Sequence, residues 1–219
     1  MGPIKAAVFD IDGTVIKGFT EYYFYRYLFR ERKITPLAFF KGAISFLLFK
    51  LGLLSIDSLR SDYANATEGF EVLEFDRLVE QFFAEQIGPR IFPEIKEIIS
   101  ANRKDGFKII LSTAAFDRIA RGYIGLLKAD HLIATGMEAE DGKLSGRVIG
   151  AINYGENKRS IMTEFIKSYN VDAKNSRAYA NDISDLSLLQ LFGDPVACNP
   201  DARLRKIAKQ KGWEIRKFH

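Results

Sequence analysis

The chain has 219 residues, of which 47% are hydrophobic and 27% charged, a composition typical of a folded globular protein and not of a disordered one. A chain of this length buries a large core, and its single cysteine, Cys198, cannot form an internal disulfide. We therefore expect a cytoplasmic protein in a reducing compartment.

The distribution of charge and hydrophobicity excludes two further classes. The net charge is +4, but residues 203–219 carry seven Lys/Arg and one Glu, so the remainder sums to about −2. A solvated basic helix explains this tail, and we expect no nucleic-acid partner. The most apolar stretch, residues 37–54, is interrupted by Lys41 and Lys50, whereas a membrane-spanning helix needs about 20 apolar residues.

Strands and helices alternate along most of the chain. Residues 4–9 form an apolar run of strand length, and residues 19–87 carry apolar side chains at helical spacing. Beyond them the pattern predicts, in order, a helix at 95–101, a strand at 107–111, a helix at 116–127, a hairpin around Asp141-Gly142, a helix at 158–170, strands at 178–180 and 195–198, and a last helix capped by Asp201.

This order predicts an α/β fold, a Rossmann-like parallel sheet core with an inserted all-helical cap. The core comprises residues 1–16 and 89–219, and the cap comprises residues 17–88. Ligands of open parallel sheets bind where the strands end, at their carboxyl ends. Polar residues follow three of the predicted strands there: Asp10 and Asp12, then Ser112 and Thr113, then Asn181, Asp182 and Asp185.

Two features indicate phosphate chemistry. The run Asp10-Ile11-Asp12-Gly13-Thr14 directly follows a buried strand, although Asp and Gly also favour ordinary turns. Lys158 opens a predicted helix, where the macrodipole disfavours a cation, so it either holds an anion or faces solvent. Clustered carboxylates with a hydroxyl and a lysine suit Mg²⁺ and phosphoryl transfer.

These residues resemble the four ordered motifs of the haloacid dehalogenase-like (HAD) phosphatases. Asp10 to Thr14, Ser112, Lys158 and the run 180–185 correspond to the motifs in order. The helical insert resembles the C1 cap of the phosphoserine phosphatase-like branch, subfamily IB. The segments 142–146, 154–158 and 199–201 are also similar to members of that branch.

The resemblance implies a Mg²⁺-dependent phosphomonoester hydrolase. Asp10 would be the nucleophile that forms an aspartyl-phosphate, and Asp12 would protonate the leaving oxygen and then activate water. Ser112 would bind a phosphoryl oxygen, and Lys158 would neutralise charge. The implied phosphate-binding residues are Gly13, Thr14, Ser112, Thr113 and Lys158, and the candidate metal ligands are Asp10, Asp12, Asn181, Asp182 and Asp185.

Two departures from the family pattern concern the metal and the substrate. Asn181 stands where related sequences place a metal-binding Asp. We favour Asp182 as the ligand, directly or through water, with Asp185 supporting Lys158 or a metal-bound water, and we expect weaker Mg²⁺ binding. Phosphoserine-specific relatives carry an acidic residue nine positions after the nucleophile, where this chain has Phe19. Glu21 is near but offset, so phosphoserine is not favoured as the substrate.

The cap is rich in aromatic residues, since 11 of the 28 fall in residues 19–49. They form either the core of a small cap or an apolar surface for a lipid-tailed phosphate or a membrane interface. We expect a small organic phosphate or a lipid-related phosphate as substrate. The oligomeric state stays open.

Two other functions remain as alternatives. One is a receiver-like phospho-acceptor module, which also uses an Asp, a hydroxyl, a Lys and Mg²⁺ but needs neither Asp12 nor a cap. The other is a catalytically weakened phosphate-binding protein, because Asn181 removes one negative charge from the predicted metal site.

Overall fold

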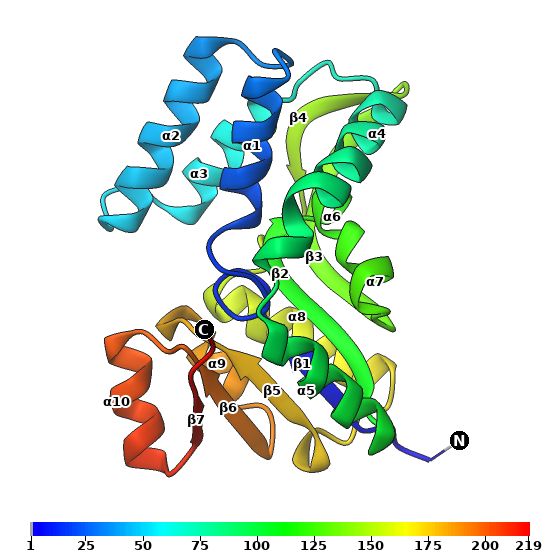
Figure 1. The fold of residues 1–219 in the computed structure, drawn as a ribbon, viewed down its shortest axis with the longest axis vertical. Helices are drawn as coiled ribbons and strands as arrows, with labels where there is room; N and C mark the ends of the chain where they lie inside the picture. The colour runs from blue at the N-terminus through cyan, green and yellow to red at the C-terminus, as the bar shows by residue number, and fades with distance from the viewer. Residues whose placement is uncertain (1) are drawn as a thin grey trace.

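The computed structural model describes residues 2–219 and shows a helical lobe above a lobe that contains most of the sheet (Figure 1). The strands are β1 (Ala6–Phe9), β2 (Lys108–Phe116), β3 (His131–Glu140), β4 (Lys143–Ile149), β5 (Arg177–Ala180), β6 (Asp194–Cys198) and β7 (Glu214–Arg216). The helices of the upper lobe are α1 (Thr20–Arg30), α2 (Pro36–Lys50), α3 (Ile56–Asn65) and α4 (Val72–Phe82). The other helices are α5 (Pro93–Lys104), α6 (Asp117–Ala120), α7 (Gly122–Leu127), α8 (Gly155–Ser168), α9 (Leu186–Leu189) and α10 (Ala202–Lys211).

The seven strands within residues 2–219 form one sheet in the order β4-β3-β2-β1-β5-β6-β7. All neighbouring strands are parallel except β3 and β4, which form an antiparallel hairpin. β1 lies in the middle, between β2 and β5, and α1–α4 are inserted between β1 and α5. The predicted α/β fold, a parallel sheet core with an inserted helical cap, is therefore confirmed.

The sheet is buried on both faces, because helices cover each side. Along β1, Ala7 and Phe9 face the cluster that contains α5, α6 and α7, while Ala6 and Val8 face the cluster that contains α8, α9 and α10. Side chains of a strand alternate between the two faces of a sheet, so a strand buried on both faces is apolar throughout. This explains why the run before Asp10 predicts a strand without any alternation.

Most of the aromatic residues in the cap point inward. Phe24 packs edge-on against Phe75 and Phe82 at 5.3 and 5.2 Å, and Tyr25 stacks on Tyr63 at 4.3 Å. Of the 11 aromatic residues in 19–49, only Phe40 is among the exposed large hydrophobic residues. The aromatic residues thus form mainly the cap core and the wall of the pocket described below. No helix within residues 2–219 is long and apolar enough to cross a bilayer.

The β3–β4 hairpin reaches up into the cap (Figure 1). Its turn, Asp141-Gly142, has φ values of 48° and 78°, the left-handed conformation that the sequence predicts for a tight hairpin. Backbone hydrogen bonds join its β4 side to the cap: Gly69 N–H to the Leu144 carbonyl at 2.8 Å, and Leu144 N–H to the Phe70 carbonyl at 2.9 Å. The hairpin lies outside the predicted cap, residues 17–88, but its backbone is hydrogen-bonded to the cap.

The second strand is longer than the sequence predicts. The apolar run ends at Leu111, whereas β2 continues to Phe116, and its pairing with β3 shifts register between Ser112 and Phe116. The extension is held because Glu21 Oε1 accepts the Phe116 N–H at 2.9 Å. Ser112 and Thr113 thus lie at an irregular point within a strand, not at its end.

The predicted helices 116–127 and 158–170 also differ from the structure. The first is split into α6 and α7, and Gly122 at the start of α7 packs so closely on Phe83 that a Cβ would lie 2.6 Å from its ring. The second begins at Gly155, so Lys158 does not open the helix but is its fourth residue. The short strand β7 carries no clear sequence signal. Asp201 caps α10 as predicted, accepting the N–H groups of Arg203 and Leu204.

Candidate active site

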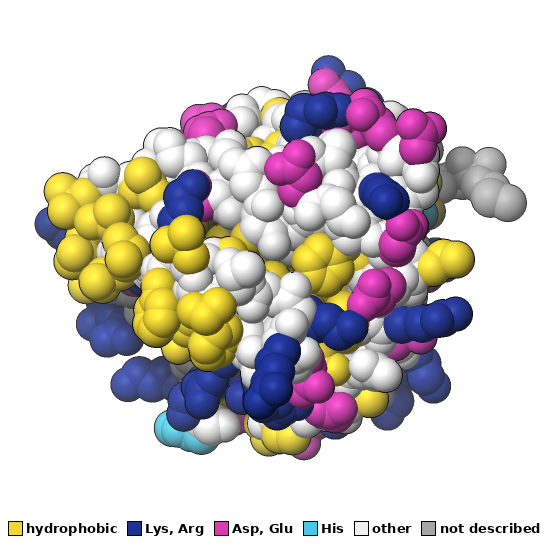
Figure 2. Space-filling model, turned by 90° about the horizontal axis from the view of Figure 1, so that it is seen from above, with side chains coloured by type: hydrophobic (Ala, Val, Ile, Leu, Met, Phe, Trp, Pro, Cys, Tyr) yellow, Lys and Arg dark blue, Asp and Glu magenta, His cyan; other side chains and the backbone are white. Residues whose placement is uncertain are grey.

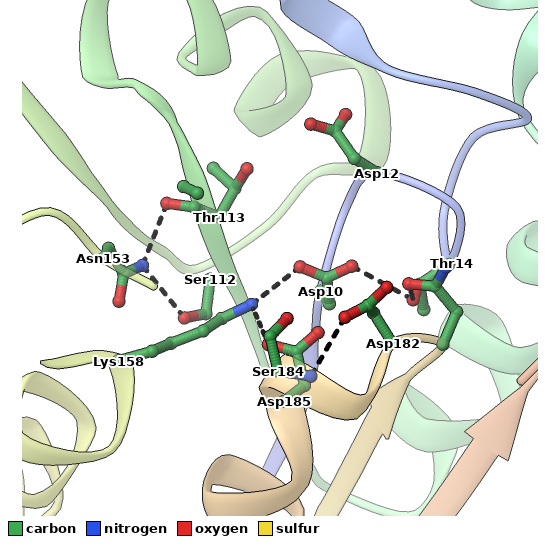
Figure 3. Close-up of polar contacts among 12 residues, drawn as sticks. Asp10, Asp12, Thr14, Ser112, Thr113, Asn153, Lys158, Asp182, Ser184 and Asp185 are labelled. Atoms are coloured by element: carbon green, nitrogen blue, oxygen red, sulfur yellow. Dashed lines mark hydrogen bonds and ion pairs between the residues drawn. The ribbon is translucent and has the colours of Figure 1, made fainter. Parts of the chain in front are cut away.

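The predicted site residues meet at the carboxyl edge of the sheet, beneath the cap (Figure 3). A pocket of about 360 Å³ lies between core and cap. The predicted residues that line it are Asp10, Asp12, Thr113, Lys158, Asn181, Asp182 and Asp185. Gly13, Thr14 and Ser112 are outside this lining set, and Ser112 is completely buried.

Lys158 lies between two buried carboxylates. Its Nζ is 2.7 Å from Oδ1 of Asp10 and 2.7 Å from Oδ1 of Asp185. Burial raises the pKa of Asp185 to about 7 and also raises the pKa of Asp10, whereas the two carboxylates raise the pKa of Lys158 despite its burial. Lys158 therefore owes its position to two anionic side chains from other elements, not to the start of a helix.

Asp12 is turned toward the cap and away from Lys158 (Figure 3). Its Oδ1 accepts the N–H of Thr20 at 2.8 Å and also the Thr20 hydroxyl, which contacts the Tyr123 hydroxyl at 2.9 Å. Burial raises the pKa of Asp12, and the hydrogen bonds from Thr20 oppose this shift. Since Thr20 is the first residue of α1, Asp12 links the core directly to the beginning of the cap.

Asn181 packs against the turn that follows Asp10. Gly13 has φ +88°, and a Cβ there would lie 2.2 Å from the Asn181 amide nitrogen, so the turn requires glycine on two grounds. The Thr14 hydroxyl lies 3.2 Å from Oδ2 of Asp10 and 3.1 Å from Oδ1 of Asn181. Gly13 and Thr14 thus fix the relative positions of Asp10 and Asn181.

No sequence motif marks Asn153, although it anchors the second motif. Its amide nitrogen donates to Ser112 Oγ at 3.2 Å and to the carbonyl oxygens of Thr113 and Ile133, both at 3.0 Å. The two carbonyls fix the orientation of the amide, so Ser112 accepts from it and its own proton is free to point elsewhere. The Thr113 hydroxyl accepts the N–H of Ala115 at 3.1 Å.

The backbone of the loop after β5 is held by side chains of the loop and by Asp201, the N-cap residue of α10. Asp182 Oδ1 accepts the N–H of Ser184 at 2.9 Å, and Asp201 Oδ2 accepts the N–H of Ile183 at 2.7 Å. Asp182 lines the pocket, whereas the Asp185 carboxylate accepts a hydrogen bond from Lys158. The two acidic residues of the loop therefore have different surroundings.

The oxygen atoms around Asp10 are chemically suited to Mg²⁺. Within residues 2–219, no three or more His, Cys, Asp or Glu side chains are arranged as a metal cluster. Asp10, Asn181 and Asp182 nonetheless line one pocket with carboxylate and amide oxygens, which are hard ligands. Burial raises the pKa of Asp10 even beside Lys158, because the ionised carboxylate is disfavoured in a buried position. A bound cation would stabilise this ionised form. The donor set fits a Mg²⁺ ion that retains several waters.

A second buried ion pair, Glu21 with Arg60, lies at the cap side of the pocket. Both side chains are less than 10% exposed, and burial lowers the pKa of Arg60 to about 10. No motif marks Arg60, which belongs to the third cap helix. The remaining cap wall is largely apolar, with contributions from Phe19, Phe46, Phe49, Leu54, Ile56 and Leu59.

The sequence profile of the haloacid dehalogenase-like hydrolase family matches residues 7–190, a range that contains all of these strand-end residues. The chain belongs to this family. The hydrolase is 31% identical to a phosphoserine phosphatase of Mycobacterium tuberculosis over 97% of this chain and 70% of the relative. It is 29% identical to a probable phosphatase of the same species, over 97% of this chain and 75% of the relative.

Other relatives match over nearly their whole length. A histidinol-phosphatase of Neisseria meningitidis is 25% identical over 97% of this hydrolase and 98% of the relative. A protein of unknown function from Bordetella pertussis superposes with a TM-score of 0.90 at 22% identity, covering 98% of each chain. A phosphoserine phosphatase structure, with a TM-score of 0.70 and 18% identity, covers 98% of this chain and 93% of the other.

These matches identify the hydrolase as a phosphatase of the phosphoserine phosphatase-like branch with a C1 cap. They favour an enzyme over the receiver-like module, whose fold needs no helical cap. Membership of the family does not identify the substrate of the hydrolase, because the relatives are named for different phosphates.

Replacing Lys158 of the hydrolase by Met should destabilise the fold. Without Lys158, Asp10 and Asp185 are left as unpaired buried carboxylates, and we expect the free energy of unfolding to fall by about 3–5 kcal/mol at pH 8. Their folded pKa values would rise further, and such groups stabilise the fold at low pH and lose that contribution as the pH rises. The loss should therefore be smaller at pH 5.

The measurement is urea unfolding at both pH values in metal-free buffer. Lys206→Met, on the exposed side of α10, is the matched control and should change the stability little. Equal stability of Lys158→Met and the parent at pH 8 would contradict the prediction.

Proposed function

We propose that this protein is a Mg²⁺-dependent phosphomonoester hydrolase that acts through an aspartyl-phosphate at Asp10. The observation that carries the proposal is the cluster of Asp10, Lys158 and Asp185 at the floor of a pocket that Asp12 also lines. Such a cluster offers a carboxylate nucleophile, a fixed positive charge and a second carboxyl group within one enclosed space.

In the first step, a carboxylate oxygen of Asp10 attacks phosphorus and the bond to the leaving oxygen breaks. Asp12 gives its proton to that oxygen, a role that suits a carboxyl group whose pKa is raised by burial. In the second step, Asp12 takes a proton from water, the water oxygen attacks phosphorus, and Asp10 is released with inorganic phosphate. Atoms and protons balance over the two steps.

The other polar residues position the phosphate and neutralise it. Lys158 is held by Asp10 and Asp185, so its ammonium group is fixed before substrate arrives. Thr113 would contact the phosphate from the pocket wall. The family resemblance assigns the Ser112 proton, which Asn153 leaves free, to a phosphoryl oxygen, although Ser112 is buried outside the pocket lining. Gly13 and Thr14 would support the phosphate from the turn after Asp10.

Asp10, the Asp12 carbonyl and Asn181 or Asp182 would hold the Mg²⁺ ion. When bound, the ion would neutralise phosphoryl charge as a Lewis acid. We favour Asp182 over Asn181, because the amide of Asn181 is already packed against Gly13 and bonded by Thr14.

The pocket supports a small organic phosphate with an apolar portion, or a lipid-related phosphate. Its cap side is largely apolar, and the Glu21 carboxylate is engaged by Arg60 and by the Phe116 N–H. Glu21 is therefore occupied and not free to receive a substrate ammonium group. This arrangement argues against phosphoserine, which the absence of an acid at Phe19 also disfavours.

Replacing Asp10 by Asn should abolish turnover. Removal of the nucleophile is expected to lower kcat by about four orders of magnitude or more. The measurement is Mg²⁺-dependent phosphate release from an aryl phosphate and from a panel of amino-acid, sugar, amino-alcohol and lysolipid phosphates. Asp57→Asn, an exposed carboxylate on α3, is the matched control and should retain full activity. Activity that survives in Asp10→Asn would refute the mechanism, and no activity in the parent would favour a phosphate-binding protein.

Replacing Thr20 by Val should shift the pH dependence of the reaction upward. The Thr20 hydroxyl stabilises the ionised form of Asp12, so its removal raises the pKa of Asp12 further. The limb of the pH–kcat profile that Asp12 controls is expected to move to higher pH. Thr20→Ser retains the hydroxyl and should leave the profile in place, and identical profiles for Thr20→Val and the parent would contradict this role of Asp12.

Replacing Asn181 by Asp should strengthen Mg²⁺ binding. A carboxylate adds one negative charge beside Asp10, and we expect the Mg²⁺ concentration for half-maximal activity to fall roughly tenfold. A metal titration of activity measures this change. Asn157→Asp, on the exposed side of α8, adds the same charge and should have no such effect. A titration curve unchanged in Asn181→Asp would show that Asn181 lies outside the metal site.

A further inference from the structure

One face of α2 is apolar and uncovered. Its large side chains recur at intervals of three and four residues, which places them in a single line along the helix. We define the outer stripe by four of these residues and two that follow the helix: Leu37 (80% exposed), Phe40 (58%), Ile44 (57%), Leu47 (57%), Leu51 (63%) and Leu53 (71%). Figure 2 shows the corresponding hydrophobic patch on the left of the molecule, where α2 lies.

The opposite face of α2 is also apolar, and it is already in use. Phe39 stacks on Phe29 with ring centroids 4.4 Å apart, and Phe46 and Phe49 line the pocket. A helix that is apolar on all sides is normally enclosed on all sides. No part of the described residues 2–219 covers the outer stripe, and the cap core does not account for it.

The outer stripe has a basic surround. Residues 30–50 contain five Lys/Arg and one Glu, and α2 itself has no acidic residue. Arg30, Lys33 and Lys41 pair with Glu85, Glu74 and Asp62, so within the described part of the chain the unpaired cations of this segment are Arg32 and Lys50. Lys41 is 61% exposed even though it pairs with Asp62, and Lys50 is exposed beside Phe19. Lys and Arg side chains border the patch in Figure 2. An apolar stripe with a basic border complements a surface that is apolar inside and anionic outside.

The outer stripe also adjoins the entrance of the pocket. Lys50 and Gly52 are exposed and line the pocket, and Leu54 lines it as well. Leu51 and Leu53, which alternate with them, belong to the outer stripe. Whatever covers the stripe therefore lies next to the entrance through which a substrate would pass.

We propose that the outer stripe docks this protein onto an anionic lipid surface, with the pocket entrance at the interface. A second copy of the chain is disfavoured as the partner, because a two-fold contact places the same patch on both sides and would bring two basic borders together. Anionic lipid offers opposite charge at the border and hydrocarbon beneath it. The proposal extends the proposed function but does not depend on its chemistry, since docking is measured without substrate.

The experiment is co-sedimentation of the full chain with vesicles of phosphatidylcholine alone or with about 30% phosphatidylglycerol. We expect the partition coefficient to be about tenfold higher on the anionic vesicles and to fall with added salt. The double variant Leu37→Glu/Leu47→Glu should bind at least about 100-fold more weakly than the parent. The control double variant Leu73→Glu/Ile149→Glu adds the same two negative charges outside the outer stripe, at residues that are 73% and 53% exposed. It should bind like the parent.

Each other outcome would overturn the proposal. These outcomes are a parent that binds no vesicle, two double variants that lose binding equally, and a parent that sediments as a dimer which Leu37→Glu/Leu47→Glu dissociates without any vesicle binding. Hydrolysis of a soluble aryl phosphate serves as a separate readout, because the outer stripe does not line the pocket. A parent that binds anionic vesicles but hydrolyses no aryl phosphate would count against the proposed function and not against docking.

Discussion

The site depends on one electrostatic constraint, a lysine ammonium group that is buried with two carboxylates. Lys158 Nζ bridges Asp10 and Asp185, and none of the three side chains is more than 9% exposed. Removing Lys158 would leave the two carboxylates without a counter-charge in a region of low polarity. The end of β1, the first turn of α8 and the loop after β5 must therefore keep their relative positions. Because β1 and β5 are neighbours in the sheet, the backbone already places the two carboxylates on the same side.

A second set of contacts fixes the cap to the core. Asp12 accepts two hydrogen bonds from Thr20 at the start of α1, and Glu21 accepts the N–H of Phe116 at the end of β2 while pairing with Arg60 of α3. The cap is thus fixed to the core by carboxylates at its entry, close to the reacting group. A displacement of Thr20 relative to the core would break the hydrogen bonds that Asp12 accepts.

Features that depend on neighbours in sequence could be predicted, and features that depend on distant partners could not. The apolar run before Asp10, the turn at Asp141-Gly142 and the cap at Asp201 are local, and the sequence locates each of them. Asn153 and Arg60 belong to no motif, because their partners are 41 and 39 positions away. The fold class and seven of the residues that line the pocket are therefore predictable, whereas the register shift in β2 and the burial of Ser112 outside the pocket lining arise from tertiary packing.

The apolar residues of α2 show a second limit on what the sequence predicts. The sequence shows that residues 37–54 are apolar, but composition does not distinguish a side chain that has a partner from one that lacks it. In the structure the aromatic residues of this helix turn mostly toward the cap core and the pocket, and the exposed line consists largely of leucine and isoleucine. Aromatic rings pack efficiently against one another in a small core, so the cap is complete without the aliphatic face. Because the residues of that face are 57–80% exposed and form a large apolar surface, its composition is better explained by a contact outside the chain than by the stability of the fold.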